Sequence, residues 1–511
     1  MFSSVKTMSL LGLSASVVTV EADISDGLPV FDMVGYLANE VKEARERVRT
    51  ALKNSGLSLP AKRITVNLSP GDIKKSGTSF DLAVALALLA SLEIIPAEGL
   101  EKSMVFGELS LTGQVRPVPG ILPMVIEAGR YGIKNCIVPF DNAAEGSVVE
   151  GVNVTGVKTL NEAIGYMKGE LLCPQGKKEN NVCETNANEK ADVDFSDVNG
   201  QETVKRAMEI AAAGMHNILI IGPPGSGKTM LAKRLPTILP SLSIQECMEI
   251  TKIYSISGKL EKGQGLIRKR PFVNPHHTVT AQALAGGGSI PRPGECSLAH
   301  KGVLFLDELP EFSGNTLEIL RQPMEDREVH ISRTQGNFTF PSDFLLCAAM
   351  NPCKCGYYPD LNKCTCSASD VKKYLSKISG PLLDRIDICA EASRIKYSEL
   401  KRCDKAEDSE TIRERVKKAA MIQNERYAGT GIRFNSELSA SDLEKYCVLG
   451  KKEEELMKNA YDMLSLSARV YHRILKVART IADLEGSDRI NVSHLSEAIA
   501  FKSIDRRYWH G

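Results

Sequence analysis

A glycine-rich segment that follows a short apolar run has the residue types needed to bind phosphate. The run covers residues 217–221 and leads directly into a segment with phosphate-loop spacing, Gly222-Pro223-Pro224-Gly225-Ser226-Gly227-Lys228-Thr229. Glycines let the backbone N–H groups of such a loop point at phosphate oxygens, and the N-terminus of the helix that follows adds partial positive charge. The pattern predicts an ATP site in which Lys228 reaches the β- and γ-phosphates and Thr229 ligates Mg²⁺.

A second apolar run, residues 302–306, ends in the acidic pair Asp307-Glu308. Carboxylates placed after a buried strand can hold magnesium and activate the water that attacks the γ-phosphate. We expect Asp307 to hold the ion through water and Glu308 to orient and deprotonate the attacking water. Taken alone, an acidic pair after a strand is usually only a strand terminus, so the phosphate loop upstream is what favours the hydrolytic interpretation.

Two CxC pairs, separated by eight residues, lie in a loop rich in glycine, tyrosine, proline and asparagine. The four cysteines are Cys353, Cys355, Cys364 and Cys366. Four thiolates complete a tetrahedral zinc site and leave no open position, so such a zinc is structural and not catalytic. The spacing is tighter than the usual CxxC, and a loop of reduced cysteines without metal is the alternative. The chain has 13 cysteines and no secretory signal, which indicates a reducing, cytoplasmic compartment.

The elements that must position these residues fall into three blocks. Residues 1–168 mix strands and helices, whereas residues 169–192 are polar and predict a linker. Residues 193–395 alternate helices with short apolar strands, which is typical of an α/β fold with a parallel sheet. In residues 396–511 the strand patterns disappear and a helical domain is expected. The main predicted elements are helices over 38–54, 81–92, 410–426, 453–463, 468–484 and 492–501, and strands over 8–24, 63–68 and 135–139.

The composition is that of an ordinary soluble protein with more than one domain. A chain of 511 residues exceeds what one hydrophobic core usually supports. Hydrophobic residues make up 43% and charged residues 25%, with Lys+Arg 64 against Asp+Glu 63, so the overall charge identifies no partner. A DNA-binding protein of this balance would concentrate its basic residues in a pore or on one face. No run approaches the length needed to span a membrane.

Several long segments are more specific than the phosphate loop. They are Asn274-Pro275-His276-His277, Gly286-Gly287-Gly288, Pro291-Arg292-Pro293-Gly294-Glu295, Leu306-Asp307-Glu308-Leu309-Pro310-Glu311-Phe312, Asn351-Pro352-Cys353-Lys354-Cys355-Gly356 and Gly380-Pro381-Leu382-Leu383-Asp384-Arg385-Ile386-Asp387. Through these segments nearly the whole chain resembles the magnesium-chelatase-like AAA+ proteins of the ComM/YifB family. The resemblance implies a Lon-protease-like α+β N-terminal domain, a P-loop AAA+ parallel-sheet core and a C-terminal helical lid.

The resemblance also implies roles for three residues outside the phosphate loop. Asn351 is similar to the polar sensor that contacts the γ-phosphate or its water. Arg385 resembles the arginine finger that stabilises transition-state charge in a neighbouring subunit's site, and Arg469 resembles the second sensor that reaches the nucleotide from the lid. For each arginine the alternative is a surface salt bridge. A finger that acts in trans implies a homo-oligomeric ring, and this family resembles hexameric motors.

Residues 329–333 and 338–340, with a turn at Gln335-Gly336-Asn337, predict a β-hairpin. In related AAA+ motors such a hairpin lines the pore of the ring, together with an insertion similar to residues 274–295. The resemblance therefore makes five residues candidates for contact with a DNA backbone, the alternative being ordinary loop polarity: His276, His277, Arg292, His330 and Arg333.

The first block resembles a Lon-protease-like domain through Lys75-Ser76-Gly77-Thr78-Ser79-Phe80-Asp81-Leu82, in which Ser79 occupies the place of the nucleophile. A serine needs a base to attack. In Lon proteases the lysine follows a strand and a Gly-Gly turn, but no lysine occurs in residues 103–132 of this chain. We infer a fold retained without peptidase chemistry, for assembly or for contact with DNA or a partner.

Four functions fit a magnesium-dependent ATP hydrolase of this kind. The first is a DNA-translocating motor, which the ComM resemblance places in branch migration during natural transformation and homologous recombination. The second is a chelatase-type motor subunit that works through protein partners, and the Lon-like block argues against it. The third, an ATP-dependent protease, is disfavoured by the missing lysine. The fourth is a protein remodeller that needs no nucleic acid. ATP hydrolysis is common to all four.

Overall fold

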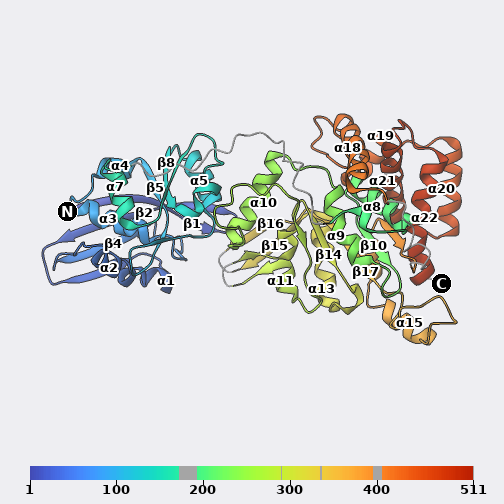
Figure 1. Cartoon of the computed structure of the whole chain (residues 1–511), viewed down its shortest axis with the longest axis horizontal. Helices are drawn as coiled ribbons and strands as arrows, with labels where there is room; N and C mark the ends of the chain where they lie inside the picture. Colours follow the sequence, from blue (N-terminus) through green and yellow to red (C-terminus); the bar gives the residue numbers. More distant parts are fainter. Residues whose placement is uncertain (172–192, 289–290, 334–335, 395–405, 510–511) are drawn as a thin grey trace. The chain divides into compact units, whose positions relative to one another are not determined.

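The computed structural model describes residues 1–171, 193–288, 291–333, 336–394 and 406–509 (Figure 1). The chain divides into two compact units. The first comprises Met1–Thr185, Ser243–Arg268 and Gly288–Pro293, and the second comprises the remainder of the chain. The predicted linker lies almost entirely outside the described residues, as does the predicted boundary at residue 395, so the division into three domains stays a prediction.

The first unit is built on a seven-stranded mixed sheet with the order β3-β4-β2-β1-β5-β8-β9. Strands β1 (Phe2–Leu11) and β2 (Ser14–Ser25) are antiparallel neighbours. The predicted strand over 8–24 is therefore the end of one strand, a turn at Gly12 and a second strand; Gly12 has a φ of 63°, which glycine adopts without strain. The other strands are β3 (Val30–Val34), β4 (Arg63–Ser69), β5 (Ser103–Val105), β8 (Asn135–Pro139) and β9 (Asn153–Val157).

Helices pack on this sheet and bury its apolar positions. Helix α3 (Asp81–Ser91) is buried along its whole length, as its near-continuous run of Leu, Ala and Val requires. The predicted helix over 38–54 is interrupted at Glu43, giving α1 (Asn39–Lys42) and α2 (Ala44–Asn54). The remaining main helices of the first 171 residues are α5 (Ile121–Arg130) and α7 (Leu160–Met167).

A helix from the middle of the chain also belongs to the first unit. Helix α10 (Ile244–Ser257) has a capping box at Ser243 and Glu246, which satisfies N–H groups at its start. Near its end, Ser255 Oγ donates to Glu145 Oε2 at 2.6 Å, and the Ser255 carbonyl accepts from Gly120 N at 3.1 Å. The sequence pattern assigned this segment to the central block, whereas its hydrogen bonds tie it to the N-terminal one.

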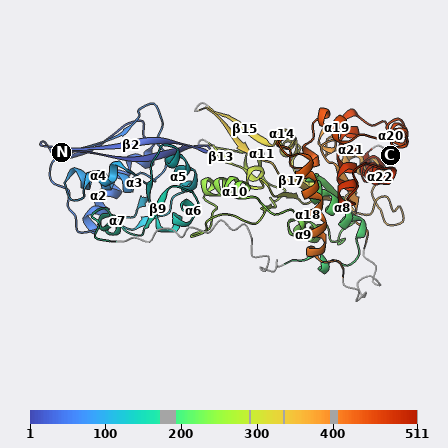
Figure 2. The ribbon, with the colours of Figure 1, turned by 90° about the horizontal axis from the view of Figure 1, so that it is seen from above.

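The second unit contains a five-stranded parallel sheet with the order β11-β14-β17-β10-β18, as the α/β pattern predicted (Figures 1 and 2). Its three central strands are completely buried, which explains their unbroken apolar sequences. The strands are β10 (Ile218–Ile221), β11 (Phe272–Val273), β14 (Val303–Leu306), β17 (Leu345–Met350) and β18 (Ile388–Glu391). Helices α8 (Glu202–Gly214) and α9 (Lys228–Ile238) flank β10 in the chain.

The C-terminal residues are helical, as predicted, and share one hydrophobic core with the parallel sheet. Ile220 and Phe305 of the sheet belong to the same buried cluster as Ile412, Ile481 and Leu495 of the helices. The helices are α18 (Ser409–Arg426), α19 (Ala440–Tyr446), α20 (Lys451–Met463), α21 (Ala468–Leu484) and α22 (Val492–Trp509). Helix α22 extends past the predicted end at residue 501.

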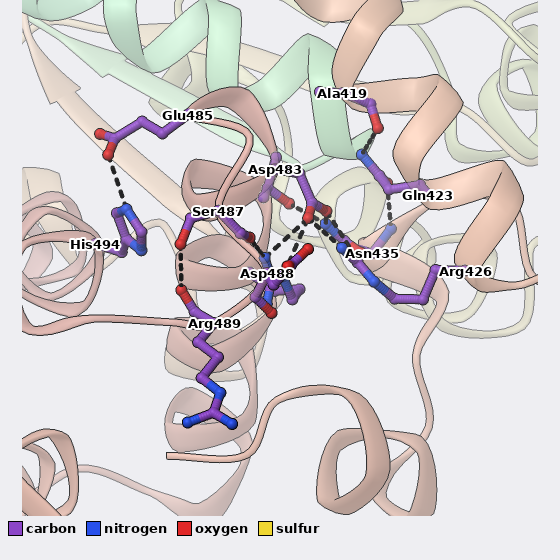
Figure 3. A network of polar contacts seen from close by, with 12 residues as sticks. Ala419, Gln423, Arg426, Asn435, Asp483, Glu485, Ser487, Asp488, Arg489 and His494 are labelled. Atoms are coloured by element: carbon purple, nitrogen blue, oxygen red, sulfur yellow. Dashed lines mark hydrogen bonds and ion pairs between the residues drawn. The ribbon is translucent and has the colours of Figure 1, made fainter. Parts of the chain in front are cut away.

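A buried polar network joins α18 to α21 around the carboxylate of Asp483 (Figure 3). Both Asp483 oxygens accept from Arg426, at 2.9 and 2.5 Å, and Arg479 Nε donates to Oδ1 at 3.1 Å. Asn435 Nδ2 completes the set at 2.8 Å. The Asp483 side chain is 0% exposed, so its charge depends entirely on these donors.

Replacement of Asp483 by alanine should lower the free energy of unfolding by about 3 to 5 kcal/mol, because it leaves two arginines of a buried network without their carboxylate. Denaturant unfolding followed by circular dichroism measures the loss. Asp462→Ala on the exposed side of α20 is the matched control and should change stability by less than about 0.5 kcal/mol. Equal stability of the two variants would contradict the role assigned to this network.

Candidate nucleotide-binding site

The phosphate loop leaves the end of β10 and enters α9, the order that the sequence predicted. Gly225 and Gly227 have φ values of 74° and 84°, in the left-handed region that glycine tolerates best. Gly222 meets a different constraint, because a Cβ there would lie 2.5 Å from the backbone oxygen of Ala392. The three glycines therefore have separate structural reasons, and together they let the backbone turn tightly before the helix.

Lys228 lies inside this loop. Its Nζ donates to the carbonyl oxygens of Gly222 at 2.8 Å and Pro223 at 2.9 Å, and to Asn351 Oδ1 at 3.1 Å. Burial lowers the pKa of the Lys228 ammonium, although the charge of Asp307 opposes the shift. The hydrogen bond to Asn351 links the phosphate loop to the predicted sensor at the end of β17.

The predicted magnesium ligands lie in contact. Thr229 Oγ1 donates to Asp307 Oδ2 at 2.6 Å, so the first turn of α9 and the end of β14 present a hydroxyl and a carboxylate side by side. Magnesium prefers such oxygen ligands and keeps several waters, so this donor pair fits the ion. The sheet explains the contact between Thr229 and Asp307. Only β17 lies between β14 and β10, and the carboxyl ends of parallel strands lie at one edge of the sheet.

Glu308 follows in the left-handed conformation, with a φ of 52°, and its N–H donates to Asp307 Oδ1 at 2.9 Å. Its side chain is 60% exposed, and Glu308 Oε2 lies 3.6 Å from His277 Nδ1. The His277 ring in turn lies 4.1 Å from the His276 ring, centroid to centroid. One predicted DNA contact, His277, therefore lies against the predicted catalytic base.

Arg385 follows α16 (Gly380–Leu383) and is only 7% exposed. It forms an ion pair with Glu325 of α14 (Arg321–Asp326), and its Nη1 donates to the Pro381 carbonyl at 2.8 Å. Its Nε has no hydrogen-bond partner among the described residues. A cavity of 790 Å³ lies beside it. Among those residues no hydrogen bond or ion pair joins Arg385 to the phosphate loop of its own chain.

Arg469 is exposed at the start of α21, and the structure does not bring it to the phosphate loop by any hydrogen bond or ion pair of the described residues. One turn later, Arg473 Nη1 donates to the Arg385 carbonyl at 3.0 Å and forms an ion pair with Asp387. Sequence reasoning missed Arg473. The available signal was its place four residues after Arg469, on the same helical face.

Asp387 is buried between Arg473 and His216, whose Nδ1 lies 3.6 Å from Asp387 Oδ2. Burial alone would raise the pKa of this carboxyl, but the Arg473 charge and the His216 contact hold it well below its ordinary value of 3.8. The stabilisation is fully present above pH 3.8 and is lost only as the pH falls through the lower folded-state pKa. The ion pair therefore persists at neutral pH.

The predicted hairpin is present as β15 (Glu328–Arg333) and β16 (Gly336–Pro341). The predicted turn is wrong in register, because Gly336 pairs with Arg333 and Asn337 pairs with Ser332, so both belong to the strand. One face of the hairpin is buried and the other is exposed and polar, with His330 Nδ1 and Thr339 Oγ1 3.0 Å apart. Arg292, on β13 (Arg292–Pro293), belongs to the first unit.

The four cysteines of the CxC pairs converge. Their sulfurs all lie within 4.8 Å of one another, and Cys353 Sγ is 3.3 Å from Cys355 Sγ and 3.7 Å from Cys364 Sγ. The loop that carries them begins directly after Asn351. A thiol set of this kind can hold a metal ion.

Ser79, which occupies the predicted place of a nucleophile, belongs to the first unit. Among the described residues no hydrogen bond of its hydroxyl to a lysine or histidine is found, and Lys75 is buried with its Nζ bonded to the Pro70 carbonyl. Thr78 Oγ1 donates to Glu108. A Lon-like fold without peptidase chemistry stays a prediction.

A parallel sheet with this loop, an acidic pair and a polar residue at neighbouring strand ends defines a P-loop protein of the AAA+ class. Three family models match: "Magnesium chelatase, subunit ChlI" over residues 194–400, "Subunit ChlI of Mg-chelatase" over 20–142 and "Magnesium chelatase, subunit ChlI C-terminal" over 406–502. The chain belongs to the magnesium-chelatase-like ComM/YifB family of AAA+ proteins, which indicates ATPase activity.

Relatives named YifB and ComM match over almost their whole length. The chain is 43% identical to the uncharacterized protein YifB of Salmonella typhimurium, over 99% of this chain and 98% of the relative. It is 42% identical to the competence protein ComM of Haemophilus influenzae, over 97% of this chain and 96% of the relative. A shorter match of 115 residues, 37% identical, covers 22% of this chain and 24% of the DNA repair protein RadA of Haemophilus influenzae.

Among the described residues, no helix combines the length and apolar character needed to cross a membrane.

Proposed function

We propose that this chain is a cytoplasmic, magnesium-dependent ATP hydrolase that acts on DNA as a hexameric ring. The observation that carries the proposal is the contact of Thr229 with Asp307 and of Lys228 with Asn351, at 2.6 and 3.1 Å. These contacts bring the four side chains together at one sheet edge, which supports the proposed roles in binding phosphate, holding Mg²⁺ and sensing the γ-phosphate. The match to a protein named for competence supports DNA as the substrate.

In the proposed reaction, the glycine-rich loop binds the phosphates through its backbone N–H groups and Lys228 neutralises their charge. Thr229 and Asp307 would hold Mg²⁺, which supplies charge stabilisation for the transferring phosphoryl group when bound. Glu308, exposed beside His277, removes a proton from the attacking water. Asn351 orients that water, and Arg469 reaches the nucleotide from the lid.

Arg385 is proposed to act on the site of a neighbouring subunit. It lies beside a cavity and makes no polar contact with the phosphate loop of its own chain among the described residues. An arginine supplied in trans requires that the phosphate loop of one subunit face Arg385 of the next. A closed ring meets this requirement at every interface.

The hairpin β15–β16 is the proposed DNA-contacting element. Its apolar side chains are buried, whereas His330 and Arg333 are both exposed. His330 lies on the face opposite to the buried Val329, and Arg333 is exposed at the end of β15. His276 and Arg292 are further candidates, both exposed. His277 has a second proposed role, because its contact with Glu308 would let a residue near the DNA affect the catalytic base.

We also propose that Cys353, Cys355, Cys364 and Cys366 hold one structural Zn²⁺. We propose that the chain has three domains with different roles. Residues 1–168 serve assembly or partner contact, residues 193–395 hydrolyse ATP, and residues 396–511 form the lid. A protein-remodelling or chelatase-like ATPase that works through protein partners is the alternative.

The test is steady-state ATP hydrolysis with and without single-stranded and branched DNA. DNA should stimulate hydrolysis by the wild-type protein. The double variant His330→Ala/Arg333→Ala should keep its basal rate and lose the stimulation. The slope of log affinity against log salt for DNA should also fall by about 1 with the loss of Arg333.

Lys452→Ala, an exposed cation on α20, is the matched control and should retain full stimulation. Hydrolysis that is indifferent to DNA would favour a protein-remodelling partner. Equal behaviour of the hairpin variant and the control would remove the hairpin from the DNA contact.

A further inference from the structure

The spacing of the four sulfurs is that of a metal site and not of a disulfide. A tetrahedron with Zn–S bonds of about 2.3 Å has S···S edges of about 3.8 Å, whereas a disulfide bond is about 2.05 Å long. The Sγ atoms of Cys353, Cys355 and Cys364 are separated by 3.3, 3.7 and 3.5 Å. Cys366 lies within the same 4.8 Å cluster. All four ligands of a closed tetrahedral site are thus in place.

The loop that carries the cysteines has no regular secondary structure of its own. From Asn351 to Ser367 it contains turns and no helix or strand, and α15 (Ala368–Leu375) begins only after Cys366. Within the loop, the Tyr358 N–H donates to Cys353 Sγ at 3.5 Å. The Tyr358 ring also contacts α22, because its centroid lies 6.1 Å from that of the Tyr508 ring. A metal ion would therefore cross-link the segment internally.

This loop also contacts the phosphate-binding loop. Gly356, between the two CxC pairs, approaches Pro224 so closely that a Cβ on it would lie 2.4 Å from Pro224 Cδ. Two residues before Cys353, Asn351 accepts a hydrogen bond from Lys228. The cysteine loop thus contacts the phosphate loop at Pro224 and begins beside the residue that contacts Lys228.

We propose that a Zn²⁺ bound by the four thiolates holds this loop against the phosphate-binding loop, so that metal occupancy sets the position of Pro224 and Asn351 and thereby controls ATP binding and hydrolysis. The inference rests on the proposed ATPase function. It extends that function by making the metal a positioning element of the nucleotide site. Zinc itself takes no part in the reaction, because four protein ligands leave no open coordination position.

Two substitutions in the full-length protein separate the metal from the contact. Cys364→Ser removes one ligand, so elemental analysis should show the loss of about one zinc per chain, and the Kd for a fluorescent ATP analogue should rise by about tenfold to a hundredfold. Gly356→Ala should retain its zinc and still lose about tenfold or more in kcat/KM, because the added methyl group displaces Pro224.

Two matched controls accompany these variants. Gly429 has a φ of 80° and no atom within 4 Å of an added Cβ, compared with a φ of 84° at Gly356, so Gly429→Ala imposes the same backbone strain without the contact. Cys247→Ala removes a buried cysteine of the first unit outside the cluster. Both controls should keep their zinc and nucleotide affinity.

The possible results distinguish the two proposals. Zinc-free wild-type protein with full nucleotide affinity overturns the metal clamp and leaves the ATPase proposal intact. Loss of zinc in Cys364→Ser without a change in Kd, or normal kinetics of Gly356→Ala, also overturns the clamp. Wild-type protein that holds zinc but binds no ATP overturns both proposals, although the metal site itself would remain. If Cys364→Ser does not fold, the kinetics of Gly356→Ala still test whether the cysteine loop positions the phosphate loop.

Discussion

Replacement of Glu308 by glutamine is expected to lower kcat for ATP hydrolysis by about a hundredfold to ten thousandfold, the range that a positioned general base contributes. The amide keeps the shape of the side chain but cannot accept the proton of the attacking water. Nucleotide binding should be unchanged, because Lys228, Thr229 and Asp307 are untouched. Steady-state hydrolysis and the Kd for a fluorescent ATP analogue, measured on the same preparation, separate the two effects.

Glu311→Gln is the control for this experiment. Glu311 is also acidic and lies three residues later, in a short helix that follows β14, where its side chain pairs with Lys377 at 3.5 Å. The Glu311→Gln variant should hydrolyse ATP at the wild-type rate. Full activity of Glu308→Gln would exclude Glu308 as the base.

Loss of the Arg385 side chain is expected to cost about a thousandfold or more in kcat, as for other arginines that stabilise the charge of a transferring phosphoryl group. Arg385→Ala should still bind ATP, because the arginine makes no polar contact with its own phosphate loop among the described residues. The sharper experiment mixes two inactive proteins. Arg385→Ala retains an intact phosphate loop, and Lys228→Ala retains an intact arginine.

Mixed rings should recover activity, because some interfaces then combine an intact Lys228 with an intact Arg385. The ATPase rate, measured as a function of the ratio in which the two variants are mixed, shows whether activity is recovered. Arg321→Ala is the control, since Arg321 lines the same cavity and pairs with Glu318 at 2.6 Å. Absence of recovery, in rings shown to exchange subunits, would mean that Arg385 acts within its own subunit or only supports Glu325.

Elements with a local sequence signal were predicted well. Residues 468–484 were predicted to be helical, and α21 has these bounds because Val470, Ile474, Val477 and Ile481 recur at helical spacing. The phosphate loop was found by its glycines. Its contact with Asp307 is explained by the fold, because the carboxyl ends of parallel strands lie at one edge of the sheet.

Contacts between distant segments had no such signal. Ser255 and Glu145 are 110 residues apart, so nothing near α10 indicated that it belongs to the first unit. The approach of Gly356 to Pro224 and the ion pair of Arg385 with Glu325 likewise depend on the fold. The hairpin was predicted but its turn was misplaced, because a glycine favours a turn equally well at several positions of a short loop.

One hydrophobic cluster of the second unit contains side chains of both the parallel sheet and the C-terminal helices. Tightly packed interiors have low compressibility and pass strain from one element to the next. Ile218 and Ile220 of β10, directly before the phosphate loop, belong to the same cluster as Val477 and Ile481 of α21. A displacement of β10 would therefore strain its packing against α21, so we expect the sheet and these helices to move together.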